Sequence, residues 1–252
     1  MTESPNVSDA TGQVRVGLEA AVGHVEICRP EKKNAMTTAI GAQLWHAVDR
    51  LGADPGCHAI VLYGRGGDLS SGADLSERLD PVEASRPWAS QPHAQLFRAL
   101  SAAPVPVIAV IDGWAIGMGL ALVGAATYAV AGVDSRFWLP EIRSQYLPHA
   151  VLPHLLHRVP AEVAVVWAVA GTVFTSAEAV AARLVTHTAE AGQALTAALE
   201  VAAPFVAAPR PQVEQAMGFL RASRDTRGTA QVTDWCDQQM DLMLRGGGEM
   251  DE

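Results

Sequence analysis

The segment Leu69-Ser70-Ser71-Gly72-Ala73-Asp74-Leu75, which is rich in small residues, follows an apolar stretch and a glycine-rich segment. Small side chains leave backbone N–H groups open to a ligand, and unpaired donors at a helix start favour negative charge. The segment is therefore a candidate for holding an oxygen atom on which negative charge develops. An ordinary turn in which Asp74 caps a helix is the alternative. No Gly-x-Ser-x-Gly motif supports a serine hydrolase here.

A second candidate is the segment from Asp112 to Gly119, where Gly117 and Gly119 flank Met118 and permit a tight backbone turn. The next glycine, Gly124, comes too late for the Gly-x-Gly-x-x-Gly fingerprint of a dinucleotide site. Two strand–turn–helix units that each present one N–H group could converge on a single oxygen. Such a pair of donors would form an oxyanion hole.

The third candidate is Glu141, which follows Pro140 in the apolar sequence Phe137-Trp138-Leu139-Pro140-Glu141-Ile142. Burial of this carboxyl would raise its pKa and let it exchange a proton with a carbon acid. A glutamate in the first turn of a helix is the plainer interpretation, and the residues alone leave both open.

Histidines and cysteines do not predict a metal site. His149, His154 and His157 lie near an expected helix start and could contact the site, but their spacing favours a partly buried helix over a set of metal ligands. The three cysteines are far apart and form no Cys-x-x-Cys pair, which argues against a zinc site or a disulfide framework and favours a reducing compartment.

The elements that would position these residues alternate between strands and helices in the first half of the chain, which predicts an α/β core. Strands are expected at 13–19, 22–29, 59–63, 105–111 and 128–131, and helices at about 37–51, 92–102 and 119–126. From about Pro148 the pattern becomes helical. These later helices are expected at 160–170, 176–183, 191–207, 211–222 and 231–244.

Composition limits the class of protein. A chain of 252 residues, 49% hydrophobic, can bury the core of one large domain. The net charge of −9 argues against a nucleic-acid partner, which needs a basic face. Residues 1–12 are polar and resemble a disordered tail more than a signal peptide. The uncharged run 113–133 is long enough to span a bilayer, but its five glycines favour a buried strand–turn–helix and no membrane partner.

Four segments in this order resemble the enoyl-CoA hydratase/isomerase (crotonase) superfamily over roughly residues 14–190: Arg29–Met36, Ser71–Leu75, Asp112–Gly119 and Phe137–Glu141. The resemblance implies an α/β fold, a crotonase-like spiral of ββα units with a C-terminal helical region. It also implies a homotrimer or hexamer that binds an acyl-CoA thioester. The corresponding division is a disordered tail at 1–12, the spiral core at 13–190, a helical oligomerisation region at 191–245 and a flexible tail at 246–252.

The resemblance also implies roles for individual residues. The backbone amides of Ala73 and Met118 would hold the thioester oxygen, the Met118 side chain would narrow the acyl pocket, and Glu141 would be the acid/base. The implied substrate-binding residues are Lys33, Ser71, Gly72, Asp74, Leu75 and Gly117. We expect a cytoplasmic enzyme with no metal and no cofactor, since coenzyme A is part of the substrate.

The sequence departs from the family pattern at three places. Ala121 stands where hydratases carry the first of two glutamates, Ser76 replaces a lysine, and Pro148 leads into His149 in place of a glycine-rich stretch. A single glutamate fits an enoyl-CoA isomerase, while a hydratase that holds its water with another residue is also consistent. Ala115–Gly119 further resembles carboxymethylproline synthases, which form carbon–carbon bonds. A noncatalytic acyl-CoA-binding protein is the alternative outside enzymes.

Overall fold

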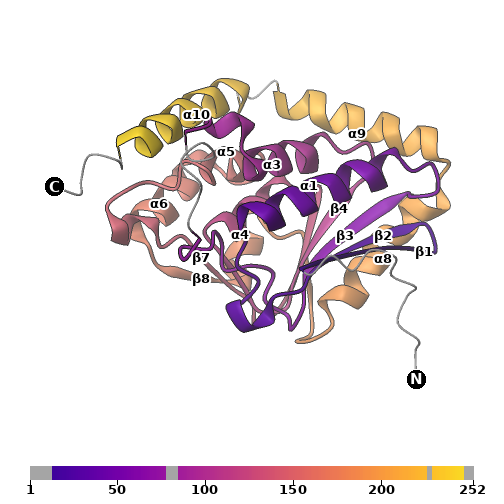
Figure 1. The fold of residues 1–252 in the computed structure, drawn as a ribbon. Helices are drawn as coiled ribbons and strands as arrows, with labels where there is room; N and C mark the ends of the chain where they lie inside the picture. The colour runs from indigo at the N-terminus through magenta and orange to yellow at the C-terminus, as the bar shows by residue number, and fades with distance from the viewer. Residues whose placement is uncertain (1–12, 78–84, 226–228, 247–252) are drawn as a thin grey trace.

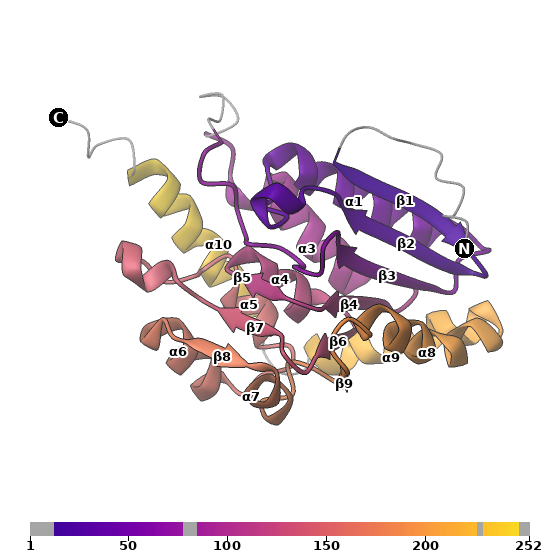
Figure 2. The same cartoon turned by 90° about the horizontal axis from the view of Figure 1, so that it is seen from below.

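A computed structural model describes residues 13–77, 85–225 and 229–246. Its larger sheet has six strands in the order β1-β2-β3-β4-β6-β9 (Figure 2). β1 and β2 pair antiparallel, and every other pair of neighbours is parallel. The strands are β1 (Val14–Glu19), β2 (Val22–Ile27), β3 (Ala59–Gly64), β4 (Val107–Ile111), β6 (Tyr128–Gly132) and β9 (His187–Ala189).

A second sheet joins β5 (Trp114–Ile116), β7 (Arg136–Trp138) and β8 (Val173–Thr175). β5 follows β4 directly and β7 follows β6, so the chain passes twice from the large sheet to the small one. Single bridges from Ala115 to Ser70 and from Ala73 to Met36 extend the small sheet toward the N-terminal half. This repeated passage is the expected spiral, and it brings segments from three successive turns side by side.

Helices cover both faces of the large sheet (Figure 1). α1 (Thr38–Ala53) and α3 (Pro92–Ala102) pack in the main core on one face. α1 begins where the Thr37 side chain accepts a hydrogen bond from the Ile40 amide, a normal N-cap. α8 (Ala194–Ala207) covers the other face, because alanines spaced four residues apart, Ala194, Ala198 and Ala202, are buried against β3, β4 and β6.

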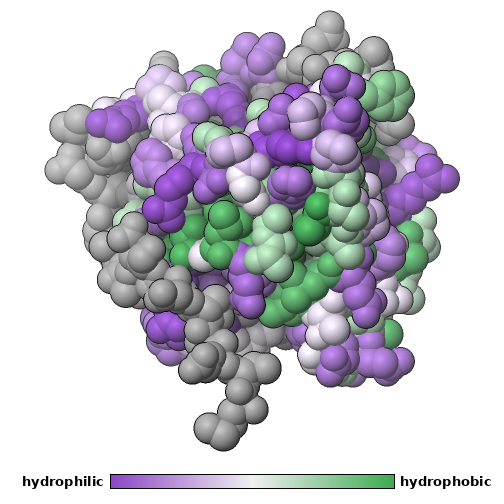
Figure 3. Space-filling view, turned by 90° about the vertical axis from the view of Figure 1, so that its right-hand side faces the viewer, coloured by the Kyte–Doolittle hydropathy of each residue, from purple (hydrophilic) through white to green (hydrophobic). Residues whose placement is uncertain are grey.

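The remaining helices lie around the small sheet and the edge of the core. They are α4 (Met118–Ala125), α5 (Leu152–Leu155), α6 (Ala161–Ala170), α7 (Ser176–Ala181), α9 (Arg210–Asp225) and α10 (Thr229–Gly246), with short 3-10 turns η1 (Pro30–Lys32), η2 (Trp88–Ser90) and η3 (Glu141–Ser144). Seven of the eight residues of α4 are buried, which is typical of a core helix. The uncharged run is thus split among β5, α4 and β6, and no helix in the described ranges is long and apolar enough to cross a bilayer. Figure 3 shows one side of the molecule, where hydrophobic side chains gather in a central patch ringed by hydrophilic ones.

The longer expected elements agree with the structure, and α3 has the expected bounds, 92–102. The sequence interpretation was wrong in missing β5, β7, β8 and β9, each only three residues long, because so short a segment shows no alternation of polar and apolar residues. Two of them, β8 and β9, lie in the part expected to be helical only. The helix expected from residue 191 begins at Ala194 and packs on the sheet. The tail expected at 1–12 and all but the first residue of the tail expected at 246–252 lie outside the described residues, and Gly246 is the last residue of α10.

Candidate active site

The first backbone donor comes from Ala73, in the extended segment that lies between Met36 and β5. The Met36 amide donates to the Gly72 carbonyl oxygen at 2.7 Å, and the Asp74 amide donates to the Met36 carbonyl oxygen at 2.9 Å. Since successive residues of an extended chain direct their N–H groups to opposite sides, the Ala73 N–H points away from Met36. Within the described part of the chain this N–H has no acceptor.

The second donor is the amide of Met118, the first residue of α4. The first N–H groups of a helix have no partner inside the helix, and the helix dipole adds partial positive charge at this end. Gly117 precedes it with φ +51°, a conformation that favours glycine. A Cβ atom on Gly119 would collide with the Ser70 carbonyl oxygen, so glycine is also required there for the two segments to approach.

The two donor loops are in direct contact. A Cβ atom built on Gly72, whose φ is +94°, would lie 2.9 Å from the Ile116 carbonyl oxygen and 3.2 Å from the Met118 amide nitrogen. Only glycine therefore fits at position 72. Because Ala73 follows Gly72 in the chain, its amide belongs to the loop that contacts the Met118 segment. Neither amide donates to a backbone acceptor within the described ranges, and two such donors on adjacent loops can form an oxyanion hole.

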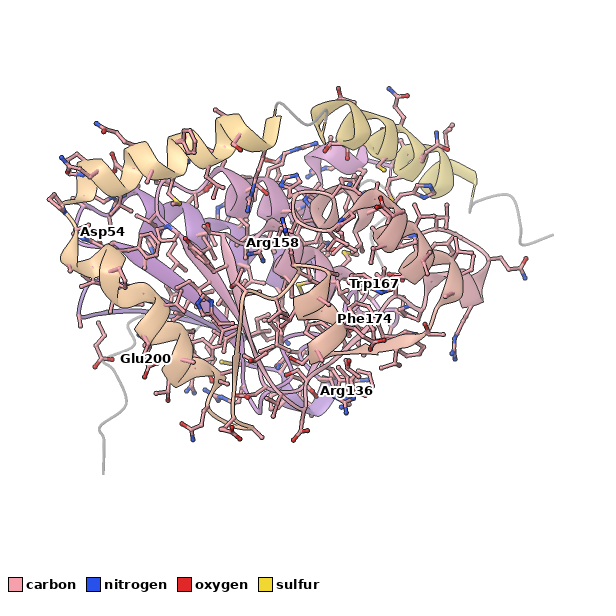
Figure 4. All side chains as sticks on the ribbon, turned by 180° about the vertical axis from the view of Figure 1, so that it is seen from behind. Asp54, Arg136, Arg158, Trp167, Phe174 and Glu200 are labelled. Carbon is pink, nitrogen blue, oxygen red and sulfur yellow. The ribbon has the colours of Figure 1, made fainter. Side chains whose placement is uncertain are left out.

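Aromatic packing fixes the segment that carries Glu141. Phe137 in β7 is fully buried and stacks on Phe174 of β8 with ring centroids 5.4 Å apart. Trp167 of α6 also stacks on Phe174, with ring centroids 3.9 Å apart (Figure 4). The Trp138 indole N–H donates to the Gly171 carbonyl oxygen at 2.9 Å. These contacts hold β7, so that Glu141 in η3 has a fixed position.

The Glu141 carboxylate lies against the donor loop of Met118. A Cβ atom on Gly117 would be 2.9 Å from Glu141 Oε1, so the absence of a side chain at Gly117 makes room for the carboxylate. Glu141 Oε2 is buried and has no hydrogen-bond partner among the described residues. Burial raises the pKa of this carboxyl above its ordinary value, as expected for a desolvated acid. The carboxylate is therefore free to accept a proton beside the two amides.

A cavity of about 270 Å³ opens in front of these groups. Seven of the predicted site residues line it together: Ser71, Gly72, Ala73, Leu75, Gly117, Met118 and Glu141. The Leu75 side chain is 92% exposed, which is unusual for a large apolar residue beside a cavity.

Lys33 and Asp74 do not line the cavity; they hold the first donor loop in place. Lys33 Nζ lies 3.0 Å from Asp68 Oδ2. The Asp74 carboxylate lies 2.6 Å from the Arg29 guanidinium and accepts hydrogen bonds from Ser76, and these, the Ser76 bonds above all, hold its pKa below the ordinary value. Both residues thus have protein partners in this structure.

Eleven further described residues line the cavity without being among the predicted site residues, and they include Met240 from α10, Tyr146 and His149. No pattern in the sequence links Met240 to a loop more than a hundred residues earlier. His149 did carry a visible signal, because it stands where the family pattern has a glycine-rich stretch. Ala121, by contrast, is fully buried in the main core and does not line the cavity. Across the described ranges no group of three or more His, Cys, Asp or Glu side chains could hold a metal ion.

Backbone donors on adjacent loops beside a buried carboxylate, at a mostly apolar cavity, are groups that can stabilise an oxyanion and move a proton on carbon. The sequence profile of the enoyl-CoA hydratase/isomerase family matches residues 17–242, and the chain belongs to this family of enzymes.

Individual relatives agree with the family. A probable enoyl-CoA hydratase of Mycobacterium tuberculosis is 34% identical over 218 residues, which cover 83% of this chain and 82% of the relative. A mitochondrial dienoyl-CoA isomerase of Mus musculus is 34% identical over 130 residues, covering 47% of this chain and 40% of the relative. The crystal structure of an enoyl-CoA hydratase/isomerase from Pseudoalteromonas atlantica has the same fold, with a TM-score of 0.80 at 23% identity, covering 95% of this chain and 93% of that one.

Proposed function

We propose that this protein binds an acyl-CoA thioester, stabilises its enolate between the amides of Ala73 and Met118, and uses Glu141 as the only carboxylate acid/base. The observation that carries the proposal is the contact of the two donor loops at Gly72 together with the Glu141 carboxylate against Gly117. The proposal includes a cytoplasmic location, a homotrimer or hexamer, and no cofactor beyond the coenzyme A of the substrate.

The chemistry follows from where charge appears. The hydrogens on the α-carbon of a thioester are weakly acidic, and removing one places negative charge on the carbonyl oxygen. Two fixed N–H donors stabilise that charge, and each donor of such a hole contributes about 2.7–4 kcal/mol to lowering the barrier. Glu141 takes the proton as its carboxylate and returns it as its acid. Returned to the γ-carbon of a 3-enoyl thioester, the proton completes an isomerisation to the 2-enoyl thioester.

Exchange of the α-proton of a saturated acyl-CoA in deuterium oxide tests this proposal, because it needs only the oxyanion hole and the base. We expect butyryl-CoA to gain deuterium with the protein and not without it, as measured by mass spectrometry. Assays with 3-enoyl and 2-enoyl thioesters would then separate isomerisation from hydration. Binding of CoA thioesters with no exchange, isomerisation, hydration or carbon–carbon bond formation would contradict the proposed activity and favour a noncatalytic acyl-CoA-binding protein.

The pH dependence of exchange should report the burial of Glu141. Only the carboxylate can accept the α-proton, and burial raises the pKa of Glu141 above its ordinary 4.5. The exchange rate should therefore rise with pH through an apparent pKa above 4.5 and level off beyond it. A rate that is already constant below pH 4.5 would contradict the assignment of this buried carboxylate as the base.

Leu75 should contribute binding energy and little to stability. Its side chain is 92% exposed at the cavity, so a bound thioester can cover it while the folded protein gains nothing from it. Burying a leucine side chain contributes about 1.5–3 kcal/mol. We expect Leu75→Ser to weaken thioester binding about 10- to 100-fold by calorimetry, with an unchanged melting temperature. Leu18→Ser on β1 is the control, and equal loss in both variants would remove Leu75 from the site.

A further inference from the structure

His149 lies in the cavity that Glu141 faces, in a loop held on both sides. The Val151 and Leu152 amides donate to the Pro148 carbonyl oxygen at 2.9 and 3.0 Å, and the His149 amide donates to the Leu147 carbonyl oxygen at 2.8 Å. The loop leads into α5, which packs on α4 so closely that a Cβ atom on Gly124 would meet the His154 backbone. The loop of His149 is thus anchored to the same helix that presents the Met118 amide.

Position 121 offers no polar group to the cavity. Ala121 is fully buried among the apolar residues of the main core and does not line the cavity. A water molecule that attacks the β-carbon of an enoyl thioester must therefore be held by some other side chain. Among the described residues that line the cavity, those with titratable side chains besides Glu141 are Arg143, Tyr146 and His149.

At neutral pH two of these three side chains are poorer hydrogen-bond acceptors for water than a neutral imidazole, because a guanidinium has no acceptor and the oxygen of a protonated phenol is weakly basic. Arg143 carries a guanidinium that stays charged, and its Cζ atom lies 4.9 Å from the centre of the Trp138 ring. Burial, and next the charge of Glu141, raise the pKa of Tyr146, so its hydroxyl keeps its proton. Burial lowers the pKa of His149, so its imidazole is neutral at pH 7 and keeps a nitrogen lone pair.

We propose that His149 is a second catalytic residue, which binds and orients a water molecule for addition to an enoyl-CoA, so that the enzyme is a hydratase. This inference rests on the proposed function. The imidazole accepts a hydrogen bond from the water, whose oxygen forms a bond to the β-carbon. The π electrons move to the α-carbon and the thioester oxygen held by Ala73 and Met118. Glu141 takes one proton from the water and gives one to the α-carbon, so that one water is added in total.

The test compares hydration with α-proton exchange in wild type, His149→Ala and His149→Gln. Hydration of crotonyl-CoA is followed by loss of the enoyl thioester absorbance, and exchange of butyryl-CoA by deuterium uptake. We expect His149→Ala to lower hydration about 100-fold, the smaller end of acid–base and positioning effects. Exchange should change by less than about threefold, because it involves no water addition. His149→Gln, whose amide oxygen can accept a hydrogen bond, should restore part of the hydration. His187→Ala, an exposed histidine of β9, is the control.

The outcomes separate the two proposals. Hydration by His149→Ala within a few-fold of wild type, or wild-type exchange and isomerisation without hydration, would overturn the role of His149 and leave the enolate site standing. Absence of both exchange and hydration in wild type would overturn the proposed function itself. Equal losses of hydration and exchange in His149→Ala would mark a structural role and also overturn the inference.

Discussion

Glu141→Gln should abolish α-proton exchange, lowering its rate about 10⁴-fold, the upper end of what a positioned acid/base contributes. The amide has nearly the shape of the carboxylate but cannot accept the proton. The oxyanion hole and the apolar cavity remain, so the affinity for a CoA thioester should stay within a few-fold of wild type. Deuterium uptake by butyryl-CoA and calorimetric binding measure the two quantities separately.

Stability gives the control for this variant. Burial raises the pKa of Glu141, which means that the folded protein carries the ionised carboxylate at a cost. A group with a raised folded-state pKa destabilises the fold as pH rises above its unfolded-state pKa. Glu141→Gln should therefore melt no lower than wild type at neutral pH. Glu200→Gln, an exposed glutamate on α8 (Figure 4), should change neither property. Exchange that persists within a few-fold in Glu141→Gln would assign the proton transfer to another residue.

The sequence predicted those parts of the fold whose signal is local. α1 and α3 have a long apolar stripe, and β3, β4 and β6 are short runs of buried apolar residues, so their existence was visible without the structure. β7 and β8 were not visible, because three residues carry no periodicity and Phe137 becomes part of the core only through Phe174 and Trp167. The small sheet thus depends on tertiary contacts that no local pattern records.

The candidate site also has parts that the sequence predicted and parts that it could not predict. Gly72, Gly117 and Gly119 marked the two donor loops in the sequence because their backbones must approach closely, and their contacts in the structure explain each glycine. The motif with Lys33 and Asp74 predicted ligand contacts, whereas both side chains hold protein partners here. Their charges fix the loop and leave its amide exposed. Met240 could not be predicted, since only the packing of α10 brings it to the cavity.

The place of Ala121 in the structure changes how the missing first glutamate is interpreted. Had Ala121 faced the cavity, the missing glutamate would have left room for a ligand or for solvent. Because Ala121 is buried in the core, the wall of the cavity is instead completed by the loop after Pro148, which carries His149. Under the role proposed for His149, the alanine at position 121 and the histidine at position 149 both bear on the addition of water. This is why His149 and Glu141 must be tested with assays that separate water addition from proton exchange.

Gly72→Ala should remove the oxyanion hole while the protein still folds. The new methyl group would lie 3.2 Å from the Met118 nitrogen and 2.9 Å from the Ile116 carbonyl oxygen, so the two donor loops must move apart. Loss of one donor costs about 100- to 1,000-fold in rate. We expect a decrease of that size in α-proton exchange, together with weaker thioester binding.

The matched control for this variant is Gly192→Ala. Gly192 also has a positive φ, +77°, but a Cβ atom there would meet no other atom within 4 Å. Both variants therefore carry the backbone strain of a non-glycine residue in the left-handed region, about 1–3 kcal/mol, and both should melt at a lower temperature. Only Gly72→Ala should lose exchange at a temperature where both are folded. Because both variants carry this strain, a lower exchange rate in Gly72→Ala alone would be due to the changed positions of the two amides. Full exchange in folded Gly72→Ala would mean that the thioester oxygen is stabilised elsewhere.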